Sequence, residues 1–109
     1  DGHFASIFQN LKKFSKIINF KERPNIFLTE KTGKPFCERF TMNLSMILLS
    51  KKIIIVLKNI KRINLFLKFI NDKNEITPIS YLVIKAKNKI FISFNNELIS
   101  LNKFKKKYA

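Results

Sequence analysis

The first apolar residues of the chain recur at intervals of three and four. Between His3 and Phe20 they are Phe4, Ile7, Phe8, Leu11, Phe14, Ile17 and Ile18, and Lys12, Lys13 and Lys16 lie off this stripe. Offsets of three and four place side chains on one face of an α-helix. The pattern therefore predicts an amphipathic helix over residues 3–20.

Residues 21–35 interrupt this pattern. The segment contains Arg23-Pro24 and, further on, Gly33-Lys34-Pro35. Two prolines and a glycine in so short a span disfavour both helix and strand. We expect a basic surface loop here, in which Arg23, Lys31 and Lys34 contact a phosphate backbone. A loop that is merely exposed accounts for the same residues.

Helical spacing returns over residues 36–50 and again over residues 53–70. The second stripe consists of Ile53, Val56, Leu57, Ile60, Ile63, Leu67 and Ile70. The run Ile53-Ile54-Ile55-Val56 is β-branched and locally favours a strand. Because the three-and-four spacing continues for several turns beyond this run, we predict a helix over the whole of 53–70.

A new helix is expected to begin at Thr77-Pro78, after a polar break at residues 71–75. A threonine side chain caps free backbone N–H groups, and proline is suited to the first helical position. Ile79, Leu82, Val83, Ala86 and Ile90 make the apolar stripe of this helix. A last amphipathic helix is predicted over 91–104, and a basic tail over 103–109.

These patterns predict an all-α fold, a single domain over 1–109 of about five helices. Residues 53–90 resemble a helix-turn-helix pair, whose second helix lies in the major groove of DNA and reads base edges. The DNA-binding residues expected on that helix are Ser80, Tyr81, Lys85, Lys87, Asn88 and Lys89. Lys105, Lys106 and Lys107 of the tail would add phosphate contacts. A helix with solvated lysines and a solubilising tail explain the same pattern.

The charge balance bears on the partner. The chain has 22 Lys and Arg against 7 Asp and Glu, a formal net charge of +15. Such an excess favours binding to nucleic acid or to an anionic membrane. Lys, Asn, Ile and Phe all have AT-rich codons, however, so a biased genome would raise the lysine content without selection for DNA. Arg, the better bidentate reader of phosphate and guanine, occurs only 3 times.

Residues suited to catalysis are few. His3 is the single histidine, and the seven acidic residues are scattered. Two-metal phosphoryl transfer needs several converging carboxylates. We therefore expect no enzyme, no metal, no cofactor and no small-molecule substrate. Cys37 is the single cysteine, which fits a reducing cytoplasm and is expected to be a small core residue.

The chain shows no secretory signal, because its first segment is amphipathic and contains lysines. The longest apolar stretch, residues 44–57, is split by Lys51-Lys52 and is too short to span a bilayer. The chain begins at Asp1, so we expect a fragment or a processed form.

A series of short motifs extends from about Arg23 to Leu101. It comprises Arg23-Pro24, Phe27-Leu28-Thr29-Glu30-Lys31, Lys34-Pro35-Phe36, the Leu-rich residues 46–52, the aromatic residues 65–70, Lys85-Ala86-Lys87-Asn88-Lys89-Ile90, and residues 91–101. This order resembles the N-terminal region of DDE transposases from bacterial insertion sequences. The resemblance implies binding to double-stranded DNA at terminal inverted repeats, as a truncated transposase without the catalytic domain that follows in that family.

Two other functions fit the same residues. Helices rich in Phe and Lys also bind anionic lipid surfaces, which favours an amphipathic protein of the membrane surface. Alternatively, the chain is a non-functional basic fragment whose charge reflects AT codon bias. Self-association is also left open by the sequence.

Overall fold

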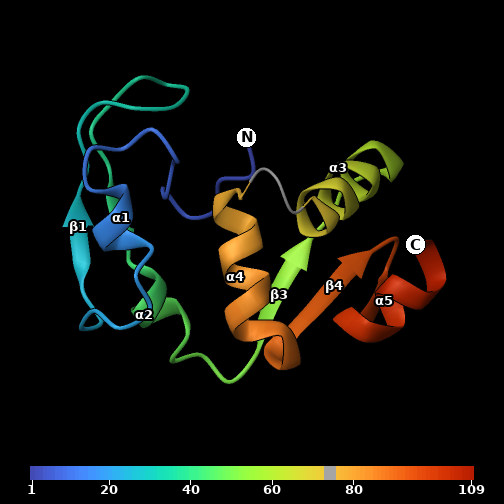
Figure 1. The fold of residues 1–109 in the computed structure, drawn as a ribbon. Coiled ribbons are helices and arrows are strands. Elements are labelled where there is room, and N and C mark those ends of the chain that lie inside the picture. Colours follow the sequence, from blue (N-terminus) through green and yellow to red (C-terminus); the bar gives the residue numbers. More distant parts are fainter. Residues whose placement is uncertain (73–75) are drawn as a thin grey trace.

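The computed structural model describes residues 1–72 and 76–109, and it shows a mixed α/β fold (Figure 1). Its elements are α1 (Phe14–Ile17), β1 (Ile26–Leu28), β2 (Phe40–Met42), α2 (Leu44–Ile47), β3 (Ile53–Val56), α3 (Ile60–Asn71), α4 (Pro78–Ala86), the 3₁₀ turn η1 (Lys87–Lys89), β4 (Ile90–Phe94), β5 (Glu97–Ser100) and α5 (Leu101–Tyr108). The described strands form two sheets. The predictions of an all-α domain and of a helical protein are therefore wrong.

The three-stranded sheet has the order β3-β4-β5. β3 pairs in parallel with β4, and Ile53 lies opposite Ile90 and Ile55 opposite Ile92. Parallel neighbours need a crossover connection, which α3 and α4 supply here. The predicted helix-turn-helix pair over 53–90 is thus wrong, because these residues form a strand, two crossover helices and the start of the next strand.

The β-branched residues 53–56 form a strand for a local reason. Their side chains are restricted about the first torsion and fit a pleated sheet better than a helix. Helix α3 begins only after Asn59, whose side-chain oxygen accepts a hydrogen bond from the Arg62 N–H at 2.9 Å. The helical prediction for 53–70 is correct from Ile60 onward and wrong before it.

The helix predicted over 91–104 is instead mostly a β-hairpin. β4 and β5 pair antiparallel, with Phe94 opposite Glu97. The two connecting residues, Asn95 and Asn96, both have positive φ, at 52° and 63°. This conformation makes the tight turn that matches the twist of a hairpin, and asparagine adopts it more readily than most residues. Helix α5 begins at Leu101, where Ser100 caps it.

The first 50 residues hold little regular structure. Of the helix predicted over 3–20 only Phe14–Ile17 is helical, yet Ile7, Phe8, Leu11, Ile17 and Ile18 are buried. The predicted loop 21–35 contains β1, which pairs with β2. The helix predicted over 36–50 contains β2 followed by α2, so the prediction holds only for the short α2.

Asn43 joins these short elements. Its side chain is fully buried and accepts hydrogen bonds from the backbone N–H groups of Asn25 (3.1 Å) and Met46 (3.0 Å). The same amide donates to the Arg23 carbonyl oxygen at 2.8 Å. One residue therefore caps α2 and fixes the chain that leads into β1.

Helix α4 begins as predicted at Thr77-Pro78. Thr77 is the N-cap, and it exchanges hydrogen bonds with Ser80 in a capping box. The polar break predicted before it falls partly on residues 73–75, which lie outside the described residues. The Ile79 N–H donates to the Gly2 carbonyl oxygen at 2.9 Å, so the N-terminal segment is attached to this helix.

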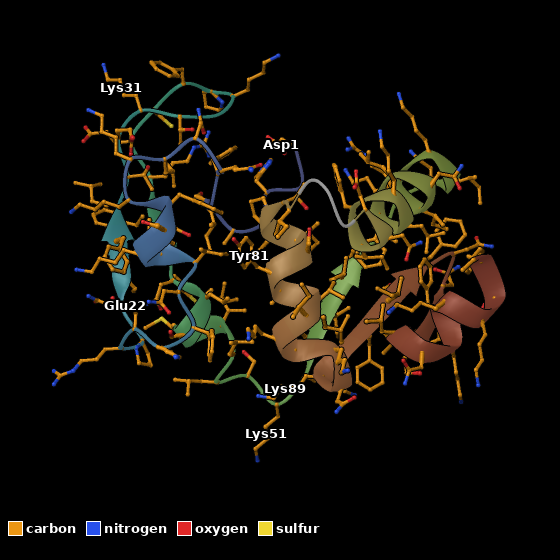
Figure 2. The ribbon with its side chains drawn as sticks, in the orientation of Figure 1. Asp1, Glu22, Lys31, Lys51, Tyr81 and Lys89 are labelled. Carbon is orange, nitrogen blue, oxygen red and sulfur yellow. The ribbon has the colours of Figure 1, made fainter. Side chains whose placement is uncertain are left out.

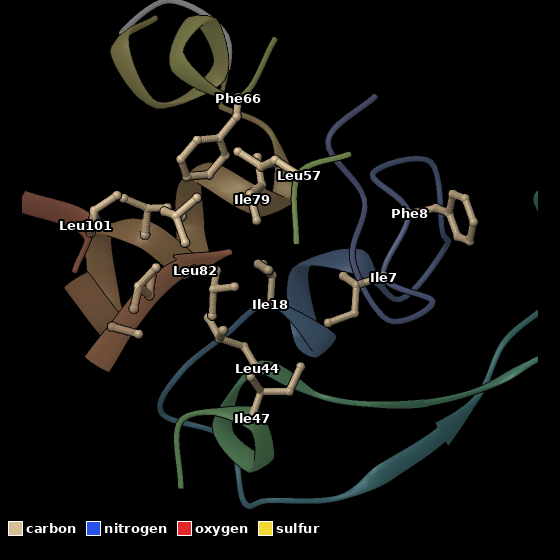
Figure 3. Close-up of a cluster of buried hydrophobic side chains, with 14 of the residues drawn as sticks. Ile7, Phe8, Ile18, Leu44, Ile47, Leu57, Phe66, Ile79, Leu82 and Leu101 are labelled. Carbon is tan, nitrogen blue, oxygen red and sulfur yellow. The ribbon is translucent and has the colours of Figure 1, made fainter. Parts of the chain in front are cut away.

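A single cluster of buried apolar side chains joins the two halves of the chain. Figure 1 shows α4 between the N-terminal elements and the three-stranded sheet. Leu82 and Ile79 of α4 have Ile18 and Leu44 on one side and Leu101 on another (Figure 3). The face of the sheet that carries Ile90 and Ile92 belongs to this core, and both side chains are about 1% exposed.

Replacing Thr77 by Ala should destabilise the protein by about 1–2 kcal/mol, because the hydroxyl that caps α4 is lost. Thr77→Ser, which keeps the hydroxyl, is the matched control and should lose clearly less. The free energy of unfolding, measured in urea, checks both. Equal losses in the two variants would show that the cap does not hold α4.

Candidate nucleic-acid interface

The predicted basic residues Lys85, Lys87 and Lys89 lie together where α4 ends. Lys85 is in the last turn of α4, and Lys87 and Lys89 belong to η1. Lys85, Lys87 and Asn88 are exposed, and Lys89 is half-buried. Cations near a helix C-terminus interact favourably with the partial negative charge of the last carbonyl groups. This effect gives these lysines a structural reason for their position as well.

Two further lysines join this group from another part of the chain. Because β3 and β4 are parallel, the residues that precede the two strands lie at the same end of the sheet. These residues are Lys51-Lys52 and Lys87–Lys89. Figure 2 shows Lys51 and Lys89 close together. The Lys89 Nζ donates a hydrogen bond to the Leu48 carbonyl oxygen at 2.6 Å, which connects η1 to the segment before β3.

A third segment reaches the same group. The Nζ of Lys85 lies 3.9 Å from the centroid of the Phe20 ring, and the Nζ of Lys21 lies 5.9 Å from it. Such contacts between an ammonium and a ring are worth about 0.5–1 kcal/mol at exposed sites. Phe20 thus holds two lysines beside one another. We call Lys21, Lys51, Lys52, Lys85, Lys87 and Lys89 the basic end.

No acidic side chain of the described residues lies within salt-bridge distance of the basic end. Lys52 instead places its Nζ 4.6 Å from the centroid of the Phe91 ring. Neutral partners such as rings and a carbonyl leave the charge of each lysine in place. The basic end is therefore a concentration of uncompensated positive charge, contributed by three separate segments.

Two of the predicted DNA-binding residues lie elsewhere on α4. Ser80 is 6% exposed, and its hydroxyl bonds with Thr77 at the opposite end of the helix. Tyr81 is half-buried and makes an edge-to-face contact with Phe14, with the ring centroids 6.1 Å apart. Both side chains serve the packing of α4 in the core.

The predicted phosphate-binding residues Arg23, Lys31 and Lys34 do not form one continuous surface. Arg23 is exposed next to Glu22, whereas Lys31 lies at the far end of the β1–β2 hairpin (Figure 2). Lys34 is exposed in the bend of this hairpin. Figure 2 places Lys31 well away from Lys51 and Lys89, so the hairpin tip is separate from the basic end.

The predicted basic tail forms the last turns of α5. Lys105, Lys106 and Lys107 lie on this helix, which carries Tyr108 against Phe94 and Phe104. The Lys107 Nζ pairs with Glu97 at 2.9 Å, and this hydrogen bond raises the pKa of Lys107. The tail residues are therefore folded, and one of their charges is partly compensated.

The residues considered for chemistry are dispersed. His3 stacks on Phe8 and bonds to Asp1, and burial, the N-terminal amine and Arg39 lower its pKa. Cys37 is half-buried near the hairpin bend, not in the core as the sequence predicts. Among residues 1–72 and 76–109, no three His, Cys, Asp or Glu side chains are grouped so that they could hold a metal ion.

Sequence reasoning missed Lys21, Lys51 and Lys52 as members of the basic end. It treated Lys51-Lys52 only as an interruption of an apolar stretch. The signal that could have found them was the β-branched run that follows these two lysines. Once that run is a strand parallel to β4, the lysines before it must lie beside η1.

Comparisons with known proteins give no relative: no protein family, no curated protein and no solved structure matches the chain. In the part of the chain that the structure describes, no helix has the length and apolar character needed to cross a membrane.

Replacing Lys89 by Met should cost about 1–2 kcal/mol of stability, because the Leu48 carbonyl loses its charged donor. Lys87→Met removes the same charge from an exposed side chain and should change stability by less than about 0.5 kcal/mol. Urea denaturation distinguishes the two. If both variants were destabilised by the same amount, the bond from Lys89 would not be what connects η1 to the segment before β3.

Proposed function

We propose that the protein binds double-stranded DNA, and that the basic end makes its main contacts with the phosphate backbone. The observation that carries the proposal is the convergence of lysines from three segments on one end of the molecule, where no acidic side chain of the described residues lies within salt-bridge distance. Duplex DNA has one negative charge per about 1.7 Å of axis, and lysines that neutralise phosphates release counterions.

The side chains of the basic end favour phosphate contact over base reading. They are lysines with a single amide, Asn88, beside them, and no arginine is among them. Bidentate recognition of guanine is the geometry of arginine more than of lysine. The protein should therefore bind duplexes of different sequence with similar affinity, and selectivity for terminal inverted repeats would need residues outside the basic end.

A duplex fits this surface better than a single strand. Proteins that bind single strands offer aromatic rings on which bases stack. The two rings at the basic end, Phe20 and Phe91, already have lysine ammonium groups over them. These rings position cations, which suits contact with a phosphate backbone, and only Phe20, at 43% exposure, offers open ring surface.

Binding to a membrane surface is the second candidate. It requires apolar side chains that are free to enter the lipid. Most phenylalanines are buried or half-buried, but Phe20 is exposed at the basic end, and Phe36 and Phe40 are more exposed on the β1–β2 hairpin. Sedimentation with vesicles that contain phosphatidylserine would detect this activity, and loss of sedimentation in Phe36→Ser/Phe40→Ser would assign it to the hairpin.

The test of DNA binding is the triple variant Lys52→Gln/Lys85→Gln/Lys87→Gln. Its affinity for a 20-base-pair duplex should fall by at least tenfold at low salt. The slope of the logarithm of the association constant against the logarithm of salt concentration should become shallower by about 0.9 for each phosphate that the variant no longer neutralises. Fluorescence anisotropy over a salt series measures both quantities.

The matched control is Lys103→Gln/Lys105→Gln/Lys106→Gln, which removes three positive charges from α5. Its affinity should fall much less, and its salt slope should stay close to that of the unaltered protein. Equal effects of the two triple variants would mean that net charge alone attracts DNA. That result would support the basic-fragment interpretation and overturn the assignment of the basic end.

The wider assignment, a truncated transposase N-terminal domain in a reducing cytoplasm, is part of the proposal but rests on the sequence resemblance and on Cys37 alone. The motifs of this resemblance lie in separate elements of the fold: the β1–β2 hairpin, α2 and the segment after it, α3, the end of α4, and the β4–β5 hairpin. A gene fragment for an acidic catalytic domain next to this one, or inverted repeats that flank both, would support it.

A further inference from the structure

One edge of the three-stranded sheet is open. In the described part of the chain, β3 pairs with β4 on one side and with no strand on the other. The Leu57 N–H donates to the Ser93 carbonyl oxygen at 2.9 Å, so Leu57 directs its backbone N–H toward β4. Successive residues of a strand direct their backbone groups to opposite sides. Ile54 and Val56 therefore direct their N–H and C=O groups away from β4.

The side chains along this edge are apolar and exposed. Ile54 is 50% and Val56 is 68% exposed, and both lie on the face opposite Ile53 and Ile55. An exposed β-branched edge strand with free backbone groups is a template for pairing with another strand. The edge thus offers both hydrogen bonds and apolar contacts to an added strand.

A groove with a volume of about 660 Å³ runs along this edge. It is lined by residues 53–57 in and directly after β3, by residues 1–5, and by Leu65 and Phe69 of α3 among others. Asp1, the acidic residue in the lining, is hydrogen-bonded to His3 at 2.7 Å. The groove gives an extended segment room beside β3.

Positive charges bracket the edge. Lys52 precedes the strand, and Lys58 and Arg62 follow it. In an antiparallel pair of two β3 strands centred on Ile55, Lys52 of each copy would lie opposite Lys58 of the other. Like charges directly opposite one another are destabilising, and each copy carries a net charge of +15. These charges disfavour a second copy and favour a strand with acidic ends.

We propose that the β3 edge binds an extended segment of another polypeptide by strand addition. The segment has apolar residues opposite Ile54 and Val56, and acidic residues opposite Lys52 and Lys58. The backbone groups of Ile54 and Val56 bind its main chain, and the acidic residues select it. This interaction does not require DNA, but it shares Lys52 with the basic end.

The probe is a synthetic peptide with the core Glu-Thr-Ile-Thr-Val-Thr-Glu. Titrated against the isotope-labelled full chain, it should shift the amide signals of residues 53–57 and give a dissociation constant below about 1 mM. A peptide with lysines in place of both glutamates should bind at least tenfold more weakly. Binding without shifts in 53–57, or no binding by 1 mM, would overturn the proposal.

Two methylated peptides test the hydrogen bonds. Methylation of the backbone nitrogen of the apolar residue opposite Ile54 removes a donor that faces β3, and affinity should fall at least fivefold. Methylation of the nitrogen of the central threonine, whose N–H points away from β3, should have a clearly smaller effect. Equal effects at the two positions would exclude strand addition.

The double variant Lys52→Glu/Lys58→Glu tests the charge selection. Both side chains are exposed, so the fold should persist. The variant should prefer the lysine-ended peptide over the glutamate-ended one, the reverse of the unaltered chain. An unchanged preference would contradict the role of these lysines.

Discussion

The parallel pairing of β3 with β4 is the constraint on which the remaining structure depends. Ile53 lies opposite Ile90, although the two residues are far apart in the sequence. Parallel neighbours cannot be joined by a tight turn, so α3 and α4 must cross over between them. The pairing also brings the residues before both strands to the same end of the sheet. Lys51 and Lys52 therefore lie beside η1.

Helix α4 joins the three-stranded sheet to the N-terminal elements through one shared core. Its first turn is held by the capping box of Thr77 and Ser80 and by the hydrogen bond from Ile79 to Gly2. Leu82 and Val83 contribute to the core that the N-terminal elements and the sheet share (Figure 3). The helix ends at the surface with Lys85. One end of α4 is therefore structural, and the other end presents charge.

The two ends of α4 show which of its features could be predicted from the sequence. The Thr77-Pro78 start and the apolar stripe from Ile79 to Ala86 depend on local rules, and both are confirmed. Ile90, predicted as the last residue of this stripe, lies in β4 instead. The lysines after the helix could likewise be placed at its end. Ser80 could be assigned to a polar face from spacing alone, but its burial depends on the bond to Thr77.

The errors arose where long-range pairing determines the structure. Ile53 to Val56 locally favour a strand, but their spacing also continues the apolar stripe of α3, and pairing with β4 decides between the two. The hairpin of β4 and β5 had a local signal in Asn95-Asn96, which the apolar spacing of the surrounding residues obscured. The convergence of Lys52 and Lys87 follows only when residues 53–56 are placed in a strand parallel to β4, so the helical interpretation could not predict it.

In the proposed function, DNA binding depends on where lysines converge rather than on how many there are. Acetylation rates of individual lysines, measured by mass spectrometry with and without a 20-base-pair duplex, test this dependence most directly. We predict that duplex DNA protects Lys51, Lys52, Lys85 and Lys87, while Lys103 and Lys106 of α5 react as before. Uniform protection of all these lysines, or protection confined to α5, would contradict the proposal.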